Sequence, residues 1–279
     1  MIKLSLQSLS YKNSFNESSI DLDGIIQKAS KMRMDGIDIH YNHFKTTDPK
    51  YLEKIRLDCL KLGLKICYIG LSNNFLLPPS EISSQINMIK KWVDIAYEMK
   101  IPMVRVFGGW LSENQTDEQA WPHLVEVTRE AVNYASTKKI ILGLHNHNHG
   151  CIPATGEQVV RLLKDINSPY FSHILDTGQF RGSPGASMGE RGKIDSSYNF
   201  YESIEKSAPF ATHIRAKIYR IGTGKEVWLD YDRIMKIFSK IQYNGWLSVV
   251  YEGQDEENEE TAIPKSVVFL REMIKKYNL

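Results

Sequence analysis

IILGLHNHNHG, residues 140–150, combines an apolar strand with three closely spaced histidines. Its first part is apolar apart from one glycine, as in a buried strand, and its second part alternates histidine with asparagine. On a strand, residues two apart share a face, so His145 and His147 point the same way, and His149 joins them if the strand extends that far. An apolar strand that ends in polar side chains is how a parallel sheet or barrel presents a site at its carboxyl edge.

Three later stretches have the same design. FSHILDTG places Asp176 at the end of an apolar run, THIRAK carries Arg215 and Lys217, and WLSVVYEG leads to Glu252. Because the carboxyl ends of parallel strands lie at one edge of the sheet, the four stretches predict one convergent site.

Short apolar strands alternate with helix-compatible segments along the whole chain. The strands are expected at 2–9, 36–40, 64–70, 102–107, 140–147, 171–176, 211–217 and 246–252. The helices are expected at 20–32, 49–62, 83–99, 117–137, 156–165, 196–207, 230–241 and 259–277. Such alternation predicts a parallel sheet. Eight units over about 250 residues fit a closed barrel better than an open doubly wound sheet.

The expected fold is therefore α/β, a single (β/α)8 TIM-barrel domain over residues 1–279. No GxGxxG motif follows the first strand, which disfavours the doubly wound alternative, and no nucleotide cofactor is expected.

Composition excludes several classes of partner. The net charge is only +2, from 35 basic and 33 acidic residues, so no nucleic-acid surface is indicated. Three scattered cysteines without a CxxC motif argue against disulfides and thiolate zinc sites and fit a reducing compartment. No apolar run approaches the roughly 18 residues of a membrane span. We expect a soluble, cytoplasmic protein without nucleic-acid or membrane partners.

Two loops near the expected site carry binding signals. The segment 177–195 directly follows Asp176 and contains five glycines together with Arg181 and Arg191, which suits a lid that binds a phosphate or carboxylate. Alternatively, this segment is an ordinary surface loop without a binding role. Trp110 and Phe75 follow the fourth and third strands, where an aromatic ring could cover one face of a sugar or simply pack.

Six motifs in a fixed order carry a resemblance. They are MRMDGIDI at the second strand, MVRVFGG at the fourth, HNH at the fifth, LDTG at the sixth, HIRAK at the seventh and VYEG at the eighth. In this order they resemble the xylose isomerase-like TIM-barrel superfamily, nearly end to end. This sugar phosphate isomerase/epimerase group also holds hydroxypyruvate isomerase, tagatose epimerase, inosose dehydratase and endonuclease IV. The resemblance implies a small-molecule sugar substrate and allows a homo-oligomer.

The resemblance also implies a divalent metal, Mn²⁺, Zn²⁺ or Mg²⁺, held by Glu, Asp, His and Glu from strands five to eight. Position by position, the Asp is Asp176 and the last Glu is Glu252. His145 stands where the first Glu is usual, and Arg215 stands where the metal histidine is usual. Gln179 replaces a histidine that often follows the aspartate.

Arg215 changes what such a site can hold. A guanidinium stays protonated and has no lone pair to offer a metal. Asp176 and Glu252 are balanced by Arg215 and Lys217, and a divalent ion is less favoured in a neutral site. We expect an altered metal site or none; His145, Asp176 and Glu252 remain a set that suits Zn²⁺ or Mn²⁺. The alternative is a buried ion network that only fills the barrel mouth.

The first functional hypothesis is a sugar, sugar-acid or sugar-phosphate isomerase or epimerase that moves a proton beside a carbonyl. A carboxylate would act as the base, a histidine would return the proton, and cations would stabilise the enediolate. The candidates are the carboxylates Glu252 and Asp176, the histidines His145 and His147, and the cations Arg215 and Lys217. Candidate substrate contacts are Trp110, Arg105, His40, Tyr68, Gln179 and Arg181. His40 and Arg105 could instead be interior hydrogen-bonding residues.

Two alternatives stay open. The same groups would suit a lyase or dehydratase acting on a keto-sugar or cyclitol, and a barrel without catalysis would bind sugar alone. An endonuclease is the least supported class, because the metal cluster is altered and the net charge attracts DNA weakly.

Overall fold

Eight parallel strands form a closed barrel in the computed structural model, which describes residues 2–185 and 191–279. The strands are β1 (Lys3–Gln7), β2 (Gly36–His40), β3 (Lys65–Gly70), β4 (Met103–Phe107), β6 (Ile141–His145), β8 (Phe171–Asp176), β9 (Ala211–Ile218) and β10 (Trp246–Tyr251). Their order is β1-β10-β9-β8-β6-β4-β3-β2, which confirms the predicted (β/α)8 architecture.

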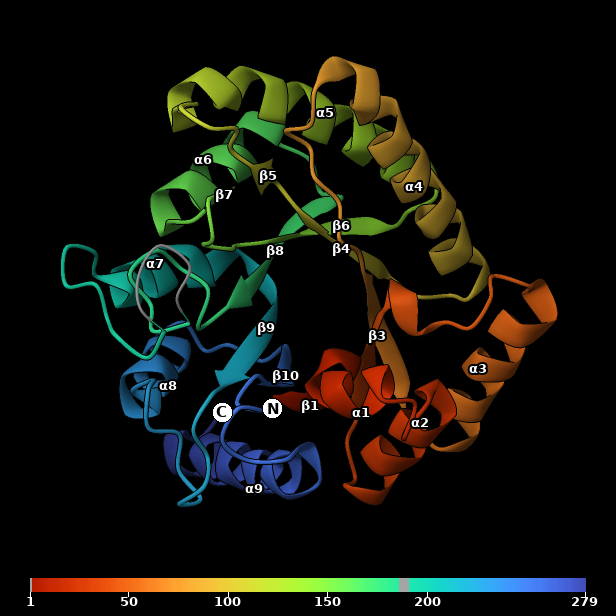
Figure 1. The fold of residues 1–279 in the computed structure, drawn as a ribbon, viewed down its shortest axis with the longest axis vertical. Coiled ribbons are helices and arrows are strands. Elements are labelled where there is room, and N and C mark those ends of the chain that lie inside the picture. Colours follow the sequence, from red (N-terminus) through yellow and green to blue (C-terminus); the bar gives the residue numbers. More distant parts are fainter. Residues whose placement is uncertain (1, 186–190) are drawn as a thin grey trace. The chain divides into compact units, whose positions relative to one another are not determined.

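Helices follow the strands along the chain (Figure 1). The α-helices are α1 (Lys12–Asn16), α2 (Leu22–Lys31), α3 (Pro49–Lys61), α4 (Pro79–Glu98), α5 (Asp117–Thr137), α6 (Gly156–Ile166), α7 (Phe200–Ser207), α8 (Tyr231–Lys240) and α9 (Glu259–Tyr277). Three short 3-10 helices are η1 (Ser8–Tyr11), η2 (Tyr41–His43) and η3 (Ala208–Phe210). Within the described ranges, none of these helices combines the length and hydropathy needed to cross a bilayer.

Internal contacts divide the chain into two units, of which the first is Ile69–Thr212. In this unit β6 pairs with β4 on one side and β8 on the other. The register sets His145, the last residue of β6, opposite Phe107, the last residue of β4. Helices α4, α5 and α6 lie outside these strands (Figure 1).

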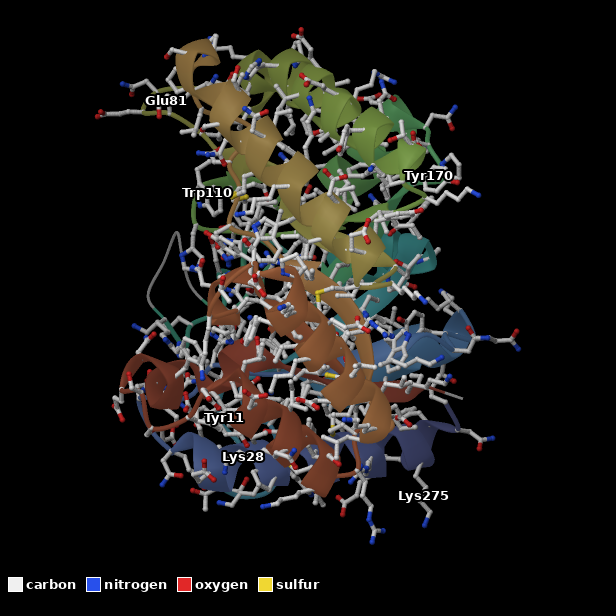
Figure 2. The ribbon with its side chains drawn as sticks, turned by 90° about the vertical axis from the view of Figure 1, so that its right-hand side faces the viewer. Tyr11, Lys28, Glu81, Trp110, Tyr170 and Lys275 are labelled. Atoms are coloured by element: carbon white, nitrogen blue, oxygen red, sulfur yellow. The ribbon has the colours of Figure 1, made fainter. Side chains whose placement is uncertain are left out.

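The second unit joins Met1–Tyr68 to His213–Leu279. Here β1 pairs with both β2 and β10, and β10 pairs with β9. This register sets Lys217 of β9 opposite Val250 of β10, two residues before Glu252. Helix α2 also contacts the segment that follows β1, since the Lys28 ammonium lies 5.7 Å from the Tyr11 ring centroid (Figure 2).

Several boundaries differ from the sequence expectations. The fifth barrel strand ends at His145 rather than at 147, because the chain turns and the His147 N–H donates to Pro153 O at 3.1 Å. Helix α4 begins at Pro79 rather than at 83, with proline at a first-turn position that tolerates its missing N–H. The helix expected from 196 begins at Phe200.

Candidate active site

His145 and Asp176 meet at the carboxyl ends of β6 and β8. His145 Nε2 lies 3.2 Å from Asp176 Oδ2, and both side chains are buried. The other carboxylate oxygen, Oδ1, accepts the Gly178 N–H at 3.0 Å. Asn146 fixes the aspartate backbone, since its Oδ1 accepts the Asp176 N–H at 2.8 Å and its Nδ2 donates to the Asp176 carbonyl at 3.0 Å.

Arg105, from the interior face of β4, contacts the other side of the imidazole. Its NH1 lies 3.2 Å from His145 Nδ1, and its guanidinium lies 4.3 Å from the Phe107 ring centroid. Arginine offers only donors, so Nδ1 must be the acceptor and the imidazole proton must sit on Nε2. In that tautomer the Nε2–H donates to Asp176. The three residues form a directed chain of hydrogen bonds.

An aromatic group borders this chain. The Phe107 ring lies 4.9 Å from His145, 5.3 Å from His147 and 5.1 Å from Trp110, centroid to centroid. Trp110 belongs to β5 (Gly109–Trp110), which pairs antiparallel with β7 (Cys151–Ile152). The sequence did not predict this two-stranded sheet. The sheet holds Trp110, the aromatic residue that was expected near the site.

Gln179 and Arg181 follow Asp176 but have different surroundings. Gln179 is buried, and within the described ranges its Oε1 has no hydrogen-bond partner. Arg181 NH2 lies 3.7 Å from Asp117 Oδ2, and its guanidinium lies 5.6 Å from the Tyr198 ring centroid. The expected lid segment 177–195 includes 186–190, which lie outside the described residues.

A second polar cluster lies in the unit formed by the two chain ends. The Arg215 NH1 donates to the Tyr68 hydroxyl at 2.6 Å, and the Gln7 amide donates to the same oxygen at 2.8 Å. Lys217 Nζ donates to Glu252 Oε1 at 2.6 Å. Lys217 is almost fully buried, whereas the Glu252 side chain is 30% exposed, so this pair has one end open to solvent.

Gln7 was not singled out from the sequence. Its only signal is a polar amide at the end of an otherwise alternating apolar strand. His40 donates its backbone N–H to Ser8 Oγ at 2.9 Å, and its ring lies 4.9 Å from Tyr41 and 5.9 Å from His43. Burial lowers the pKa of His43 to about 4, so this neighbour is neutral near pH 7. The expectation that both clusters serve one substrate stays a prediction.

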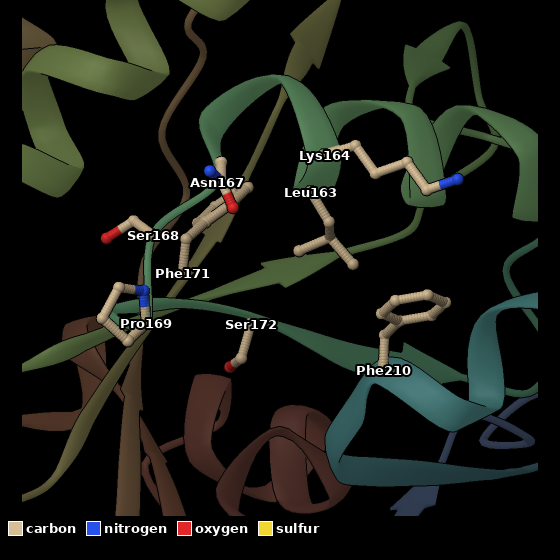
Figure 3. Close-up of a pocket in the computed structure, with 8 residues that line it drawn as sticks. All are labelled: Leu163, Lys164, Asn167, Ser168, Pro169, Phe171, Ser172 and Phe210. Atoms are coloured by element: carbon tan, nitrogen blue, oxygen red, sulfur yellow. The ribbon is translucent and has the colours of Figure 1, made fainter.

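A cavity of about 380 Å³ lies at the opposite end of β8, where α6 ends (Figure 3). It is lined by Leu163, Lys164, Asn167, Ser168, Pro169, Phe171, Ser172 and Phe210. The lining residues include no carboxylate or histidine that could accept a proton near pH 7. Since Phe171 begins β8 and Asp176 ends it, we place the candidate active site at the Asp176 end.

The hydrogen bonds of His145 decide whether these residues fit the divalent metal that the resemblance implies. A metal ligand needs a ring nitrogen with an available lone pair. Here one nitrogen accepts from Arg105 and the other carries the proton donated to Asp176. Across the described ranges, moreover, no group of three or more His, Cys, Asp or Glu side chains is arranged to hold a metal ion. The residues as placed do not fit a metal bound through His145.

Comparisons with known proteins agree on the fold. D-psicose 3-epimerase from Clostridium cellulolyticum H10, solved with D-tagatose, has a TM-score of 0.75 at 13% identity, covering 98% of this chain and 99% of that chain. The 3-keto-D-glucoside 4-epimerase of E. coli has a TM-score of 0.73 at 13% identity, covering 98% and 100%. The probable 3-DHS dehydratase of petrobactin synthesis from Bacillus anthracis has a TM-score of 0.74 at 16% identity, covering 97% and 99%.

At these identities the structural likeness concerns the fold alone. A comparison with curated protein sequences finds no match. The sequence profile of the xylose isomerase-like TIM barrel, however, matches residues 26–273, which is most of the chain. The chain therefore belongs to the xylose isomerase-like TIM-barrel family.

Proposed function

We propose that the protein is a sugar isomerase or epimerase that transfers a proton beside a carbonyl without a divalent metal. The observation that carries this proposal is the buried pair of His145 and Asp176 at the ends of neighbouring strands. A carboxylate and an imidazole are among the side chains that act as general base and general acid in proton transfer at carbon. The epimerase neighbours support a small sugar as the substrate class.

Asp176 is the proposed base. It removes a proton from the carbon beside the carbonyl, and the electron pair left behind forms the carbon–carbon double bond of an enediolate as the carbonyl oxygen becomes negative. The Gly178 N–H and the His145 Nε2–H hold the carboxylate in place. Return of the proton to the neighbouring carbon completes an isomerisation, provided that the hydroxyl proton on the first carbon's oxygen also moves to the former carbonyl oxygen. Return of the proton to the opposite face of the same carbon completes an epimerisation.

The Arg105 guanidinium, 3.2 Å from His145, supplies fixed positive charge next to this pair. In a site from which water is excluded, a fixed cation stabilises a developing oxyanion more strongly than it would in solvent. Trp110 and His147, whose ring centroids lie 6.0 Å apart, offer aromatic faces on which the C–H face of a sugar can pack.

Glu252 is the alternative base. Its carboxylate is partly exposed and accepts a hydrogen bond from the buried Lys217 ammonium. A lysine beside a carboxylate can return the proton that the carboxylate removes. The guanidinium of Arg215, oriented by the Tyr68 hydroxyl, is a further candidate for stabilising negative charge in that unit.

The test is deuterium incorporation from D2O into a panel of ketoses, keto-glycosides and sugar phosphates. Asp176→Asn should reduce the exchange rate at least about 100-fold, which is the usual effect of losing a general base. Asp94→Asn, on the surface of α4, is the matched control and should leave the rate unchanged. If Asp176→Asn and Glu252→Gln both exchange at the wild-type rate, the proposal is wrong.

A dehydratase is the second candidate, because the probable 3-DHS dehydratase shares the fold over nearly its whole length. After the same proton removal, the carbanion would expel a β-hydroxyl as water, assisted by a proton donor. A product that is lighter by one water in the same assay would favour this reaction. Sugar binding without either exchange or water loss would indicate a binding protein.

A further inference from the structure

Arg105 is held rigidly against His145. It is only 2% exposed, and its guanidinium stacks on Phe107. Gly70 of β3 provides the space, since a Cβ atom at that position would lie 2.9 Å from Arg105 NH2. The guanidinium therefore cannot swing away from the imidazole as a surface arginine would.

This contact selects one tautomer of His145. All hydrogen-bonding atoms of a guanidinium are donors, so the Nδ1 atom 3.2 Å away must accept. The acceptor on the other side is the Asp176 carboxylate, which requires a proton on Nε2. Both partners favour the same tautomer, and each reinforces the other.

A metal ion shared by His145 and Asp176 would need the opposite tautomer. The Nε2 lone pair would face the metal, and the proton would move to Nδ1. Metal-binding histidines normally donate that second N–H to a carboxylate or carbonyl acceptor. Here the Nδ1–H would meet the N–H groups of Arg105, and the fixed guanidinium charge would repel the cation.

We propose that Arg105 is the residue that excludes divalent metals from the His145–Asp176 pair. This goes beyond the proposed function, because it concerns ion selectivity and holds whether or not the pair is catalytic. It also identifies a position, 105, at which the chemical type of one side chain decides whether the pair forms part of a metal site. A hydrogen-bond donor at position 105 prevents the His145–Asp176 pair from binding a metal, and an acceptor at that position allows it.

The tautomer is tested directly by NMR on wild-type protein labelled with ¹⁵N-histidine, assigned with His145→Gln. Long-range ¹H–¹⁵N couplings distinguish a protonated Nε2 from a protonated Nδ1. We expect His145 to show a protonated Nε2 and an unprotonated Nδ1. A protonated Nδ1 in the wild type would overturn the proposal, and this readout requires neither a variant at position 105 nor a substrate.

Metal selectivity is tested with two substitutions of similar size. Arg105→Gln provides an amide oxygen that can accept the Nδ1–H and removes the charge, whereas Arg105→Lys keeps a donor-only cation. After equilibration with Zn²⁺ or Mn²⁺, Arg105→Gln should bind metal roughly 10- to 100-fold more tightly than wild type, the range typical of such outer contacts. Arg105→Lys should bind as weakly as wild type.

Adding His145→Ala to Arg105→Gln should abolish the gained affinity, which would place the ion at this pair. Thermal unfolding checks that each variant is folded before metal is added. Equal metal affinity in Arg105→Gln and wild type contradicts the proposal. So does near-stoichiometric metal in the wild type that disappears in His145→Ala. Because no turnover is measured, loss of the proposed function and failure of this inference remain distinguishable.

Discussion

Asn146 shows how one buried amide positions the strand end that carries the proposed base, Asp176. Its oxygen and nitrogen bond the backbone N–H and C=O of Asp176, so the end of β8 is tied to the end of β6. The Asp176 side chain is oriented by other groups, the Gly178 N–H and the His145 ring. Asn146 is thus part of the candidate site, although only the histidines of the HNH motif were named as candidate site residues from the sequence.

Gly253, directly after Glu252, lies where the backbone packs closely beside the cluster that contains Lys217 and Glu252. A Cβ atom there would collide with the carbonyl oxygen of Tyr219, which is backbone and cannot rotate away. We expect Gly253→Ala to lower the free energy of unfolding by about 2 kcal/mol, as overpacking usually does. Urea denaturation measures the change.

Gly222→Ala is the matched control, because the nearest atom to its added Cβ is Glu257 Oε2 at 3.8 Å. Its effect should stay within about 0.5 kcal/mol. Equal losses in the two variants would show that the close approach at Gly253 does not determine its stability.

The residue types at the strand ends could be predicted, but their partners could not. Spacing along a strand indicates which face a side chain occupies, so His145, Asp176 and Arg215 were singled out from sequence alone. Rotamers and contacts across strands depend on packing that no spacing encodes. The contact of Arg105 with His145, and that of Gln7 with Tyr68, therefore emerged only in the structure.

Local capping chemistry explains where the helices begin. Helix α6 starts with a capping box in which Thr155 Oγ1 accepts the Gln158 N–H and Gln158 accepts the Thr155 N–H. Helix α5 has the same box at Thr116 and Gln119. These signals are local in sequence, which is why both helices begin where they were predicted.

Thr155→Ala should destabilise the protein by about 1 kcal/mol, because the α6 N-terminus loses its side-chain acceptor. Chemical denaturation followed by far-UV circular dichroism gives the change. Thr137→Ala, at the exposed C-terminal end of α5, removes the same atoms without uncapping a helix and should change stability far less. A Thr137→Ala effect as large as that of Thr155→Ala would contradict the capping argument.

Short elements escaped prediction for a physical reason. The β5–β7 pair has two residues in each strand, and α1 has five, so neither shows the periodicity from which longer elements are recognised. Such pieces form because tertiary contacts hold them. Glu259 at the start of α9 illustrates this, since its carboxylate accepts the N–H groups of Asn13 and Ser14 in α1, at 2.8 and 3.0 Å.

Buried histidines make the stability of the folded protein depend on pH. Burial lowers the pKa of His173 and that of His43 to about 4, from a usual value of 6.5. His173 is held neutral in β8 with its Nδ1 3.0 Å from the Leu144 carbonyl oxygen. Between about pH 4 and pH 6.5, the unfolded chain binds protons at these two histidines that the folded chain does not bind.

Stability should therefore be full above about pH 6.5 and fall as the pH approaches 4, by up to about 1.4 kcal/mol per pH unit for each histidine. Urea midpoints at a series of pH values measure the slope. His173→Asn keeps a donor for the Leu144 carbonyl but cannot titrate, so its slope should be shallower by one proton. An unchanged slope in that variant would show that His173 does not couple folding to pH.

Proton transfer at carbon without a metal is the reaction that we propose for this barrel. Its most direct test is the rate of deuterium incorporation into an exchanging sugar by wild-type protein, measured with EDTA and then with added Mn²⁺. We expect the same rate in both conditions and a large loss in Asp176→Asn. Exchange that disappears with EDTA and returns with Mn²⁺ would contradict it.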